Sequence, residues 1–346
     1  MKKIRTLIVE DSIFFRKLLI TKLTEFPRIE VVGCAVNAFE AKNKVEELNP
    51  DVMTLDVEMP GMNGIEFLKK LLPARKLPVV LVSSLNLNVF EALSAGAVDF
   101  LRKPDMSGQG GIEGFFKELS RKIVAASIAN MKAASVPRAP VLMANPPLTE
   151  SPKLDSVIIA LGASTGGTEA TLEVLKRLPA NTPGIVIVQH MPPGFTKMYA
   201  DRVNGLCKMH VKEAQHGDNV TRGKVLIAPG DMQMKLIKMG TQYKVNCFTG
   251  EKVSGHCPSV DVLFDSAAAA GSSAIGIIMT GMGSDGAKGL LKMRQRGSFT
   301  IGQDEATSIV YGMPKIAKEL GAVMVQASNT TIADVLQRQL NQIARS

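Results

Sequence analysis

Apolar and polar positions follow two periods along the first third of the chain, and these periods predict a regular series of strands and helices. Short apolar runs are typical of buried strands, and apolar residues spaced three and four apart are typical of amphipathic helices. The predicted strands cover residues 4–9, 30–35, 51–55, 78–82 and 97–101. The predicted helices cover residues 13–26, 38–48, 64–72, 88–95 and 112–131. This alternation indicates a doubly wound α/β unit.

The second half of the chain shows apolar runs of the same kind. Three of them predict buried strands, over 156–161, 184–189 and 274–279. Between the halves, residues 133–152 are rich in proline and small side chains, a composition that favours an extended, semi-rigid linker. We therefore expect two doubly wound α/β domains, the second with a mostly parallel sheet. The expected boundaries are 1–125 for the first domain, 126–154 for the linker and 155–346 for the second domain.

Each of the three later strands ends beside a side chain that suits nucleophilic catalysis. The first runs into Gly162-Ala163-Ser164-Thr165-Gly166, and a strand ending in Gly-x-Ser-x-Gly presents a serine hydroxyl on a sharp turn. His190 follows the second strand, and Asp285 lies in a glycine-rich loop after the third. The carboxyl ends of parallel neighbours share one edge of a sheet. Ser164, His190 and Asp285 are therefore candidates for nucleophile, general base and orienting acid.

Each of these residues also has an ordinary structural explanation. The Gly-x-Ser-x-Gly sequence also suits a tight turn, His190 a hydrogen-bonded turn and Asp285 a helix cap; their coincidence at three strand ends favours the triad. The chain order Ser, His, Asp excludes the α/β-hydrolase fold, which uses Ser, Asp, His. The loop 281–286 also matches the dinucleotide-binding spacing Gly-x-Gly-x-x-Gly, with Asp304 and Glu305 downstream. The preceding strand lies late in its domain, which counts against this alternative.

The first domain places acidic residues at the ends of its predicted strands. Glu10 and Asp11 follow the first strand and Asp56 the third, while Ser83 and Lys103 follow the fourth and fifth. Alone, Asp56 would be a helix cap or a solvated turn residue. Three converging carboxylates repel one another, so a divalent cation and the Lys103 ammonium are needed to compensate them. Ligands that are all oxygen atoms indicate magnesium.

Residues 1–125 resemble the receiver domain of bacterial response regulators, with Leu55-Asp56-Val57-Glu58-Met59-Pro60-Gly61-Met62-Asn63-Gly64 as the phospho-acceptor segment. The resemblance implies a flavodoxin-like fold and phosphorylation of Asp56 by the chemotaxis histidine kinase. It also implies that Mg²⁺ is held by Glu10, Asp11 and Asp56.

The same resemblance gives roles to three further residues. Ser83 and Lys103 would contact the phosphoryl group, and Phe100 would belong to the phospho-switch. Two positions depart from the pattern of the family: Glu10 stands where many receivers have Asp, and Phe100 stands where some have Tyr. The longer Glu10 side chain changes the metal-facing arm, and Phe100 lacks a hydroxyl.

Residues from about 155 to 346 resemble the catalytic domain of the chemotaxis protein-glutamate methylesterase. The resemblance rests on the segments 162–167, 189–196 and 280–286. It implies that methyl esters on chemoreceptor glutamates are hydrolysed, with release of methanol, and that certain receptor glutamines are deamidated by the same acyl chemistry. Phosphorylation of the first domain would control access to this site.

The resemblance also assigns the residues of this site. Ser164 is the implied nucleophile, His190 the general base and Asp285 its orienter. Met282 and Thr165 belong to the implied oxyanion and active-site loop, with the Met282 backbone amide as an oxyanion donor. The esterase reaction needs no cofactor. The implied partners are the histidine kinase, as phosphodonor, and the cytoplasmic helices of the receptors, as substrate.

Composition and charge limit the partners and the cellular location that we expect for the protein. The chain of 346 residues has a formal net charge of +9, which suits an acidic partner. The sequence has no helix-turn-helix pattern, so we do not expect this partner to be nucleic acid. No apolar run is long enough to span a membrane and no signal peptide is evident, so we expect a cytoplasmic protein without membrane insertion. The four cysteines lack metal-ligand spacing. His256 and Cys257 would point to opposite faces of a strand, so we expect no reactive dyad.

Two alternative functions remain open from the sequence. In the first, the second domain has lost hydrolysis and only binds a partner; this alternative predicts a degenerate triad, whereas all three residues are present. In the second, the domain is a general serine esterase or amidase for small molecules. Methanol release from methylated receptor, compared with hydrolysis of a small ester, separates these alternatives.

Overall fold

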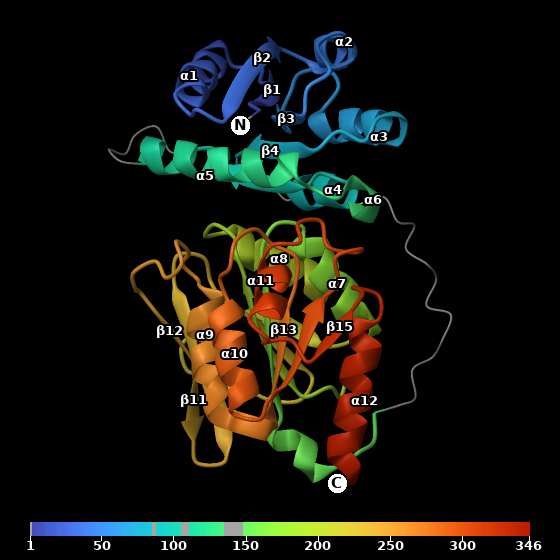
Figure 1. The fold of residues 1–346 in the computed structure, drawn as a ribbon, viewed down its shortest axis with the longest axis vertical. Coiled ribbons are helices and arrows are strands. Elements are labelled where there is room, and N and C mark those ends of the chain that lie inside the picture. The colour runs from blue at the N-terminus through green and yellow to red at the C-terminus, as the bar shows by residue number, and fades with distance from the viewer. Residues whose placement is uncertain (1, 85–87, 105–110, 135–147) are drawn as a thin grey trace. The chain divides into compact units, whose positions relative to one another are not determined.

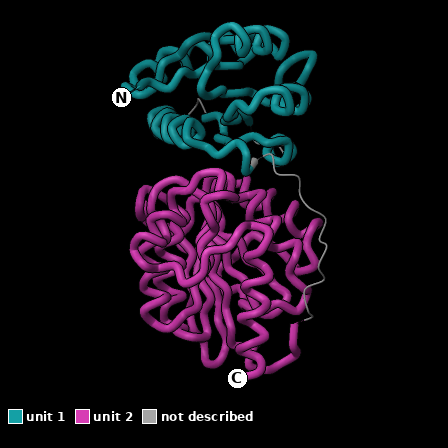
Figure 2. Tube along the Cα trace, turned by 45° about the vertical axis from the view of Figure 1, so that its right-hand side comes forward, with its two compact units in different colours: residues 1–135 teal, residues 136–346 magenta. Residues whose placement is uncertain are grey.

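A computed structural model describes residues 2–84, 88–104, 111–134 and 148–346. The chain forms two compact units, residues 1–135 and 136–346 (Figure 2). The proline-rich part of the predicted linker, 135–147, lies outside the described residues. The rest of the predicted linker contains a short helix α6 (Met131–Ala134) and a 3-10 helix η1 (Pro152–Ser156).

Five parallel strands form the sheet of the first unit, in the order β2-β1-β3-β4-β5 (Figure 1). The strands are β1 (Ile4–Val9), β2 (Ile29–Ala35), β3 (Val52–Leu55), β4 (Val79–Ser83) and β5 (Asp99–Arg102). The connecting helices are α1 (Ile13–Thr24), α2 (Ala38–Leu48), α3 (Gly64–Ala74) and α4 (Asn88–Ser94), and α5 (Gly111–Ser127) follows β5. This is the flavodoxin-like strand order, which confirms the predicted fold class.

Local chemistry explains where these helices begin and end. Ser12, Asn37 and Asn63 each accept a hydrogen bond from a backbone amide three residues ahead, which caps α1, α2 and α3. The helix predicted over 112–131 ends earlier, at Ser127. The Asn130 side chain accepts hydrogen bonds from the Lys132 and Ala133 amides. Asparagine favours such a cap over a helix interior, so a new short helix starts there.

Seven parallel strands form the main sheet of the second unit, in the order β15-β14-β13-β6-β7-β10-β8. They are β6 (Ile158–Ala163), β7 (Gly184–Gln189), β8 (His210–Glu213), β10 (Lys224–Ile227), β13 (Ala274–Ile278), β14 (Phe299–Gln303) and β15 (Val325–Ala327). The helices are α7 (Gly167–Arg177), α8 (Phe195–Asn204), α9 (Val260–Ala267), α10 (Ala287–Gln295), α11 (Met313–Glu319) and α12 (Ile332–Arg345), with a 3-10 helix η2 (Ala268–Ser273). The predicted α/β class with a mostly parallel sheet is confirmed.

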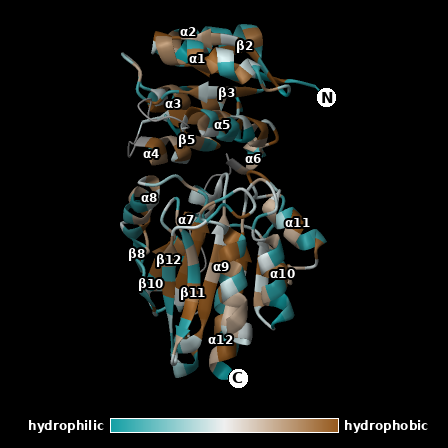
Figure 3. Cartoon of the chain, turned by 90° about the vertical axis from the view of Figure 1, so that its left-hand side faces the viewer, coloured by the Kyte–Doolittle hydropathy of each residue, from teal (hydrophilic) through white to brown (hydrophobic). Residues whose placement is uncertain are grey.

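A small antiparallel sheet in the second unit was not predicted. Its strands, in the order β11-β12-β9, are β9 (Asn219–Val220), β11 (Gln233–Met239) and β12 (Gln242–Phe248). Buried side chains such as Met234 and Val245 join the core of this unit. Figure 3 shows the strands of the main sheet as strongly hydrophobic, as expected for parallel strands covered on both faces.

Two glycines allow α9 to approach the end of β6 closely. A Cβ atom at Gly162 would lie 2.1 Å from Cγ1 of Val260, and one at Gly286 would lie 2.4 Å from the same atom. Because backbone and side chain meet at these positions, the first turn of α9 is fixed beside the carboxyl edge of the sheet. This edge carries the candidate site.

Candidate functional site

Ser164 lies directly after β6, between the ends of the two strands that flank it. On one side the His190 amide donates to the Ala163 carbonyl at 3.1 Å, and on the other the Ser164 amide donates to the Thr280 carbonyl at 2.9 Å. After β6, the chain first adds β7, β8 and β10 on one side of β6 and then adds β13, β14 and β15 on the other side. Ser164 therefore marks the point where the strand order reverses, which is where open α/β sheets carry their sites.

The turn after Ser164 is rigid and requires glycine. Gly166 has a φ of +75°, and the Gly167 amide donates to the Ser164 carbonyl at 2.7 Å. A Cβ atom at Gly167 would lie 2.4 Å from Oε1 of Gln189. Nε2 of the Gln189 side chain also donates to the Ser164 carbonyl at 2.9 Å. These contacts fix the backbone from which the Ser164 hydroxyl projects.

His190 and Asp285 meet as the sequence predicted. Nε2 of His190 lies 2.8 Å from Oδ2 of Asp285. The carboxylate accepts a hydrogen bond from Nε2, so Nδ1 of the neutral ring is the nitrogen that can accept a proton. Nδ1 is buried and has no hydrogen-bond partner within the described parts of the chain. In the general Ser-His-Asp template Nδ1 faces the carboxylate and Nε2 faces the serine. In this protein the two nitrogens have the opposite roles.

The structure brings Ser164 and His190 to adjacent positions at one edge. Ala163 and Gln189 are partners in the strand register, so the residues that follow them leave neighbouring strands side by side. The Ser164 hydroxyl makes no hydrogen bond to His190 in the described residues. Catalytic hydrogen bonds are often long without substrate and tighten in the complex, so this spacing is compatible with a nucleophile and its base.

The Asp285 carboxylate is almost fully buried and is held by the start of α9. The Ser259 hydroxyl donates to its Oδ1 at 2.7 Å, the Val260 amide to Oδ2 at 2.7 Å and the Asp261 amide to Oδ1 at 3.1 Å. Burial alone would raise the pKa of Asp285, but the hydrogen bond and charge of His190, together with these donors, hold it below its usual value. Asp285 therefore stays ionised and keeps His190 oriented.

Ser259 and His256 are functional candidates that sequence reasoning missed. The sequence offers one weak signal for Ser259, a serine placed before the apolar run of α9, as in a helix cap. His256 does not lie on a strand, contrary to the basis of the sequence prediction; it ends a tight turn. Its ring is stacked on that of His190, with centroids 3.7 Å apart. No sequence pattern near His256 reveals this contact.

Met282 and Thr165 lie in the two loops that meet at Ser164. A Cβ atom at Gly281 would lie 2.6 Å from Cβ of Ser164, so the loop of Met282 passes close to the hydroxyl. The Met282 amide donates to no acceptor in the described residues. The Thr165 carbonyl accepts from the Thr280 hydroxyl at 2.9 Å. An amide that is free at this place suits an oxyanion donor.

We expect Ser259→Ala to lower kcat of the second unit about 10- to 100-fold, because the freed Asp285 carboxylate positions His190 less well. Ser266→Ala, in α9, is the matched control: the Ser266 hydroxyl accepts from the Leu236 amide of β11 and does not bond Asp285. Each variant loses side-chain hydrogen bonding, fully buried at Ser259 and partly buried at Ser266, at a cost of about 1 kcal/mol. Ester hydrolysis and thermal unfolding are measured on both. Equal loss of kcat in the two variants would contradict the positioning role of Ser259.

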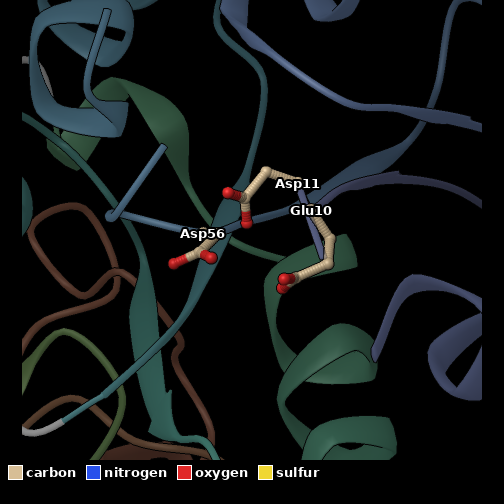
Figure 4. A group of neighbouring side chains, drawn as sticks. All are labelled: Glu10, Asp11 and Asp56. Atoms are coloured by element: carbon tan, nitrogen blue, oxygen red, sulfur yellow. The ribbon is translucent and has the colours of Figure 1, made fainter. Parts of the chain in front are cut away.

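The acidic residues of the first unit converge as predicted. Oxygen atoms of Glu10, Asp11 and Asp56 lie within 4.8 Å of one another, and Figure 4 shows the three side chains beside each other. Lys103 Nζ lies 2.6 Å from Oδ2 of Asp56 and 2.9 Å from Oε2 of Glu10. The cluster stands at the ends of β1 and β3, where the strand order of this sheet reverses.

Of the predicted switch residues Ser83, Lys103 and Phe100, Ser83 and Phe100 are buried. The Ser83 hydroxyl has no hydrogen-bond partner in the described residues, although it is buried. The Lys103 amide donates to the Ser83 carbonyl at 2.8 Å, which holds the ends of β4 and β5 together. Phe100 is 4% exposed and packs edge-on against Phe90, with ring centroids 6.2 Å apart. An orphaned buried hydroxyl fits a group that would hydrogen-bond an incoming oxyanion.

Electrostatics shows that this site lacks positive charge. Burial and then the charge of Asp56 raise the pKa of Glu10 from 4.5 to about 7. Burial also raises the pKa of Asp56, against the hydrogen bond and charge of Lys103. Burial acts to lower the pKa of Lys103, but the two carboxylates outweigh it and the pKa is raised. One ammonium does not balance three carboxylates, so the oxygen donor set fits a hard divalent cation such as Mg²⁺.

The raised pKa of Glu10 predicts a pH-dependent stability. Between pH 4.5 and about 7 the folded state binds more protons at Glu10 than the unfolded state does, so the free energy of unfolding falls as the pH rises. In EDTA at pH 8, Glu10→Gln is expected to be more stable than wild type by about 1–3 kcal/mol, and the difference should vanish near pH 4.5. The measurement is denaturant unfolding at both pH values. Glu47→Gln, on the exposed side of α2, is the control, and an equal effect there would refute the prediction.

Comparisons with known proteins identify related families for both units. The CheB methylesterase family model matches residues 159–336, and the response regulator receiver domain model matches residues 6–109. A protein-glutamate methylesterase/protein-glutamine glutaminase 2 of Syntrophomonas wolfei is 53% identical over 345 residues, covering 99% of each chain. The corresponding protein of Sulfurimonas denitrificans, named protein-glutamate methylesterase/protein-glutamine glutaminase, is 49% identical and covers 92% of this chain and 94% of its own.

A solved structure resembles the second unit. The crystal structure of the Thermotoga maritima CheB methylesterase catalytic domain is 38% identical, has a TM-score of 0.52, and covers 53% of this chain and 97% of its own. The chain belongs to the CheB methylesterase family and carries a response regulator receiver domain. This confirms the resemblance that the sequence motifs indicated. None of the helices within the described ranges has the length and apolar character needed to cross a membrane.

Proposed function

We propose that this chain is a phosphorylation-regulated serine hydrolase that removes methyl groups from glutamate esters on chemoreceptors and deamidates certain receptor glutamines, which resets receptor sensitivity in bacterial chemotaxis. The observation that carries the proposal is the buried His190–Asp285 pair beside Ser164, at the reversal point of the sheet. Two relatives that align over nearly the whole chain, with 53% and 49% identity, are named protein-glutamate methylesterase/protein-glutamine glutaminase. These names support the substrate class.

In the proposed reaction, Oγ of Ser164 attacks the ester carbonyl while Nδ1 of His190 takes its proton. The Met282 amide stabilises the negative charge that develops on the carbonyl oxygen. The tetrahedral intermediate collapses, the bond to the methoxy group breaks, and His190 returns the proton so that methanol leaves. Water then attacks the acyl-enzyme with His190 as base again, which gives a free glutamate and restores Ser164. With glutamine as substrate, ammonia leaves in place of methanol.

Asp285 supports this cycle through charge and geometry. Its carboxylate accepts from Nε2 and stabilises the imidazolium that forms when Nδ1 is protonated. Four donors surround the two carboxylate oxygens, so the anion is fixed and remains ionised. Thr165, whose carbonyl is tied to Thr280, would hold the loop that borders the carbonyl oxygen of the substrate.

In the first unit we propose that Asp56 accepts phosphate from the chemotaxis histidine kinase. Glu10, Asp11 and Asp56 would hold Mg²⁺, which supplies the positive charge that the phosphoryl oxygens require. Lys103 would pair with the phosphoryl group, and the Ser83 hydroxyl would donate to it. Phe100 would follow the displacement of Ser83 as part of the switch. The proposal places these reactions in the cytoplasm, with the receptor helices as substrate and without nucleic acid or insertion into the membrane.

The experiment that tests the proposal measures methanol release from methylated receptor membranes by the full chain, with and without acetyl phosphate and Mg²⁺. The expected result is methanol release that rises on phosphorylation. Hydrolysis of p-nitrophenyl acetate is measured in parallel. Turnover of the small ester without methanol release would favour a general esterase, and turnover of neither substrate would favour a binding-only domain; either result overturns the proposal.

A further inference from the structure

A tight turn beside the candidate site presents His256 to the catalytic histidine. Val253 and His256 exchange two backbone hydrogen bonds, of 3.0 and 2.9 Å, and the two residues between them, Ser254 and Gly255, have φ values of +53° and +84°. Two central residues with positive φ define the turn that closes a two-residue hairpin. The Gln233 side chain also donates to the His256 carbonyl, at 3.4 Å. The backbone of His256 is therefore fixed.

The ring of His256 covers one face of the His190 ring. The centroids are 3.7 Å apart and the planes differ by 9°, so the two imidazoles are stacked in parallel at van der Waals contact. The Asp285 contact at Nε2 fixes one point of the His190 ring but leaves rotation about that hydrogen bond open. A flat partner on the ring face removes that freedom. The stack therefore determines the direction in which Nδ1 points.

We propose that His256 is a positioning residue for the esterase reaction: its stacked ring holds His190 with Nδ1 directed for proton transfer from Ser164 and, while neutral, supports the imidazolium that forms. The inference rests on the proposed function, because it assumes that His190 is the base. The segment 253–261 would then serve both members of the pair, since Ser259 and the amides that follow it hold Asp285.

The charge of His256 matters as well as its shape. A neutral aromatic face attracts a cation, so neutral His256 favours protonated His190. A protonated His256 would place a like charge 3.7 Å from the centre of that ring and oppose it. Asp285 bonds His190 directly at Nε2, and burial and the charge of Asp285 raise the pKa of Asp261, whose amide bonds the same carboxylate.

The test compares three variants of the full chain, using methylated receptor membranes as substrate. His256→Ala removes the ring and is expected to lower kcat about 10- to 100-fold with KM changed less than about twofold. His256→Phe keeps a flat ring without a titrating nitrogen, so kcat at neutral pH is expected within about threefold of wild type. His216→Ala, which removes an exposed histidine bonded to Asn246 in the same unit, is the control and is expected to leave kcat unchanged.

The split between kcat and KM, together with the rescue by phenylalanine, separates positioning from general support of the fold. A folded His256→Ala with unchanged kcat, or a His256→Phe as impaired as His256→Ala, would overturn the proposal. If wild type itself releases no methanol, the proposed function has failed and not the role of His256 alone.

Discussion

Ser164→Ala is expected to lower kcat for methyl ester hydrolysis by about four to six orders of magnitude, because no other group can form the acyl-enzyme. The substitution removes a hydroxyl that makes no hydrogen bond in the described residues, so the stability of the fold should change by less than about 1 kcal/mol. The measurement is methanol release from methylated receptor membranes, with thermal unfolding of the same preparation.

A control for this experiment is available in the glycine-rich loop. Ser284 is exposed and precedes Asp285, and Ser284→Ala removes a hydroxyl from the same edge of the sheet without touching the pair. We expect it to keep nearly full activity. If Ser164→Ala retained more than about a tenth of wild-type kcat, Ser164 would not be the nucleophile.

Asp56→Asn is expected to abolish phosphorylation of the chain by acetyl phosphate, and excess EDTA is expected to do the same to wild type. The carboxylate is both the acceptor and one of three oxygen donors, and without added positive charge the site repels an incoming phosphoryl group. Incorporation of phosphate is followed by mass spectrometry of the intact protein, with Mg²⁺ or with EDTA.

Asp51→Asn provides the matched control for this prediction. Asp51 stands just before the start of β3, whereas Asp56 follows its end, and its side chain accepts from the Arg5 amide at 2.9 Å. The variant should be phosphorylated like wild type. Phosphorylation of Asp56→Asn, or phosphorylation of wild type that survives chelation, would be evidence against the magnesium-dependent site at the ends of β1 and β3.

The elements that could be predicted are those defined by local sequence. The bounds predicted for β1, α2 and β7 agree with the structure, because continuous apolar runs and helical spacing are properties of short windows. The His190–Asp285 contact was also predictable, because residues at the ends of parallel strands must meet at one edge. This contact could be predicted without knowing how the chain between the two strands folds.

The features that could not be predicted depend on contacts between distant segments. Ser259 bonds a carboxylate 26 residues away, and His256 meets a ring 66 positions earlier in the chain. The place of Ser259 before an apolar run marks a helix start but not this bond, and no local pattern marks the contact of His256. The hairpin of β11 and β12 was missed because Lys235 and Lys238, three residues apart, fall on opposite faces of β11 and interrupt the alternation of apolar and polar positions. Likewise, which nitrogen of His190 faces Asp285 is decided by ring orientation, which tertiary packing sets.

The junction of α9 with the sheet edge also has a consequence for local unfolding. The first turn of α9 supplies two amides to Asp285, and its Val260 side chain fills the space beside Gly162 and Gly286. Opening of that turn would at once release the Asp285 carboxylate and remove the Val260 side chain from its contacts with Gly162 and Gly286. Amide hydrogen exchange at Val260 therefore reports the opening equilibrium of this single helical turn, and that equilibrium sets an upper limit on the population competent for catalysis.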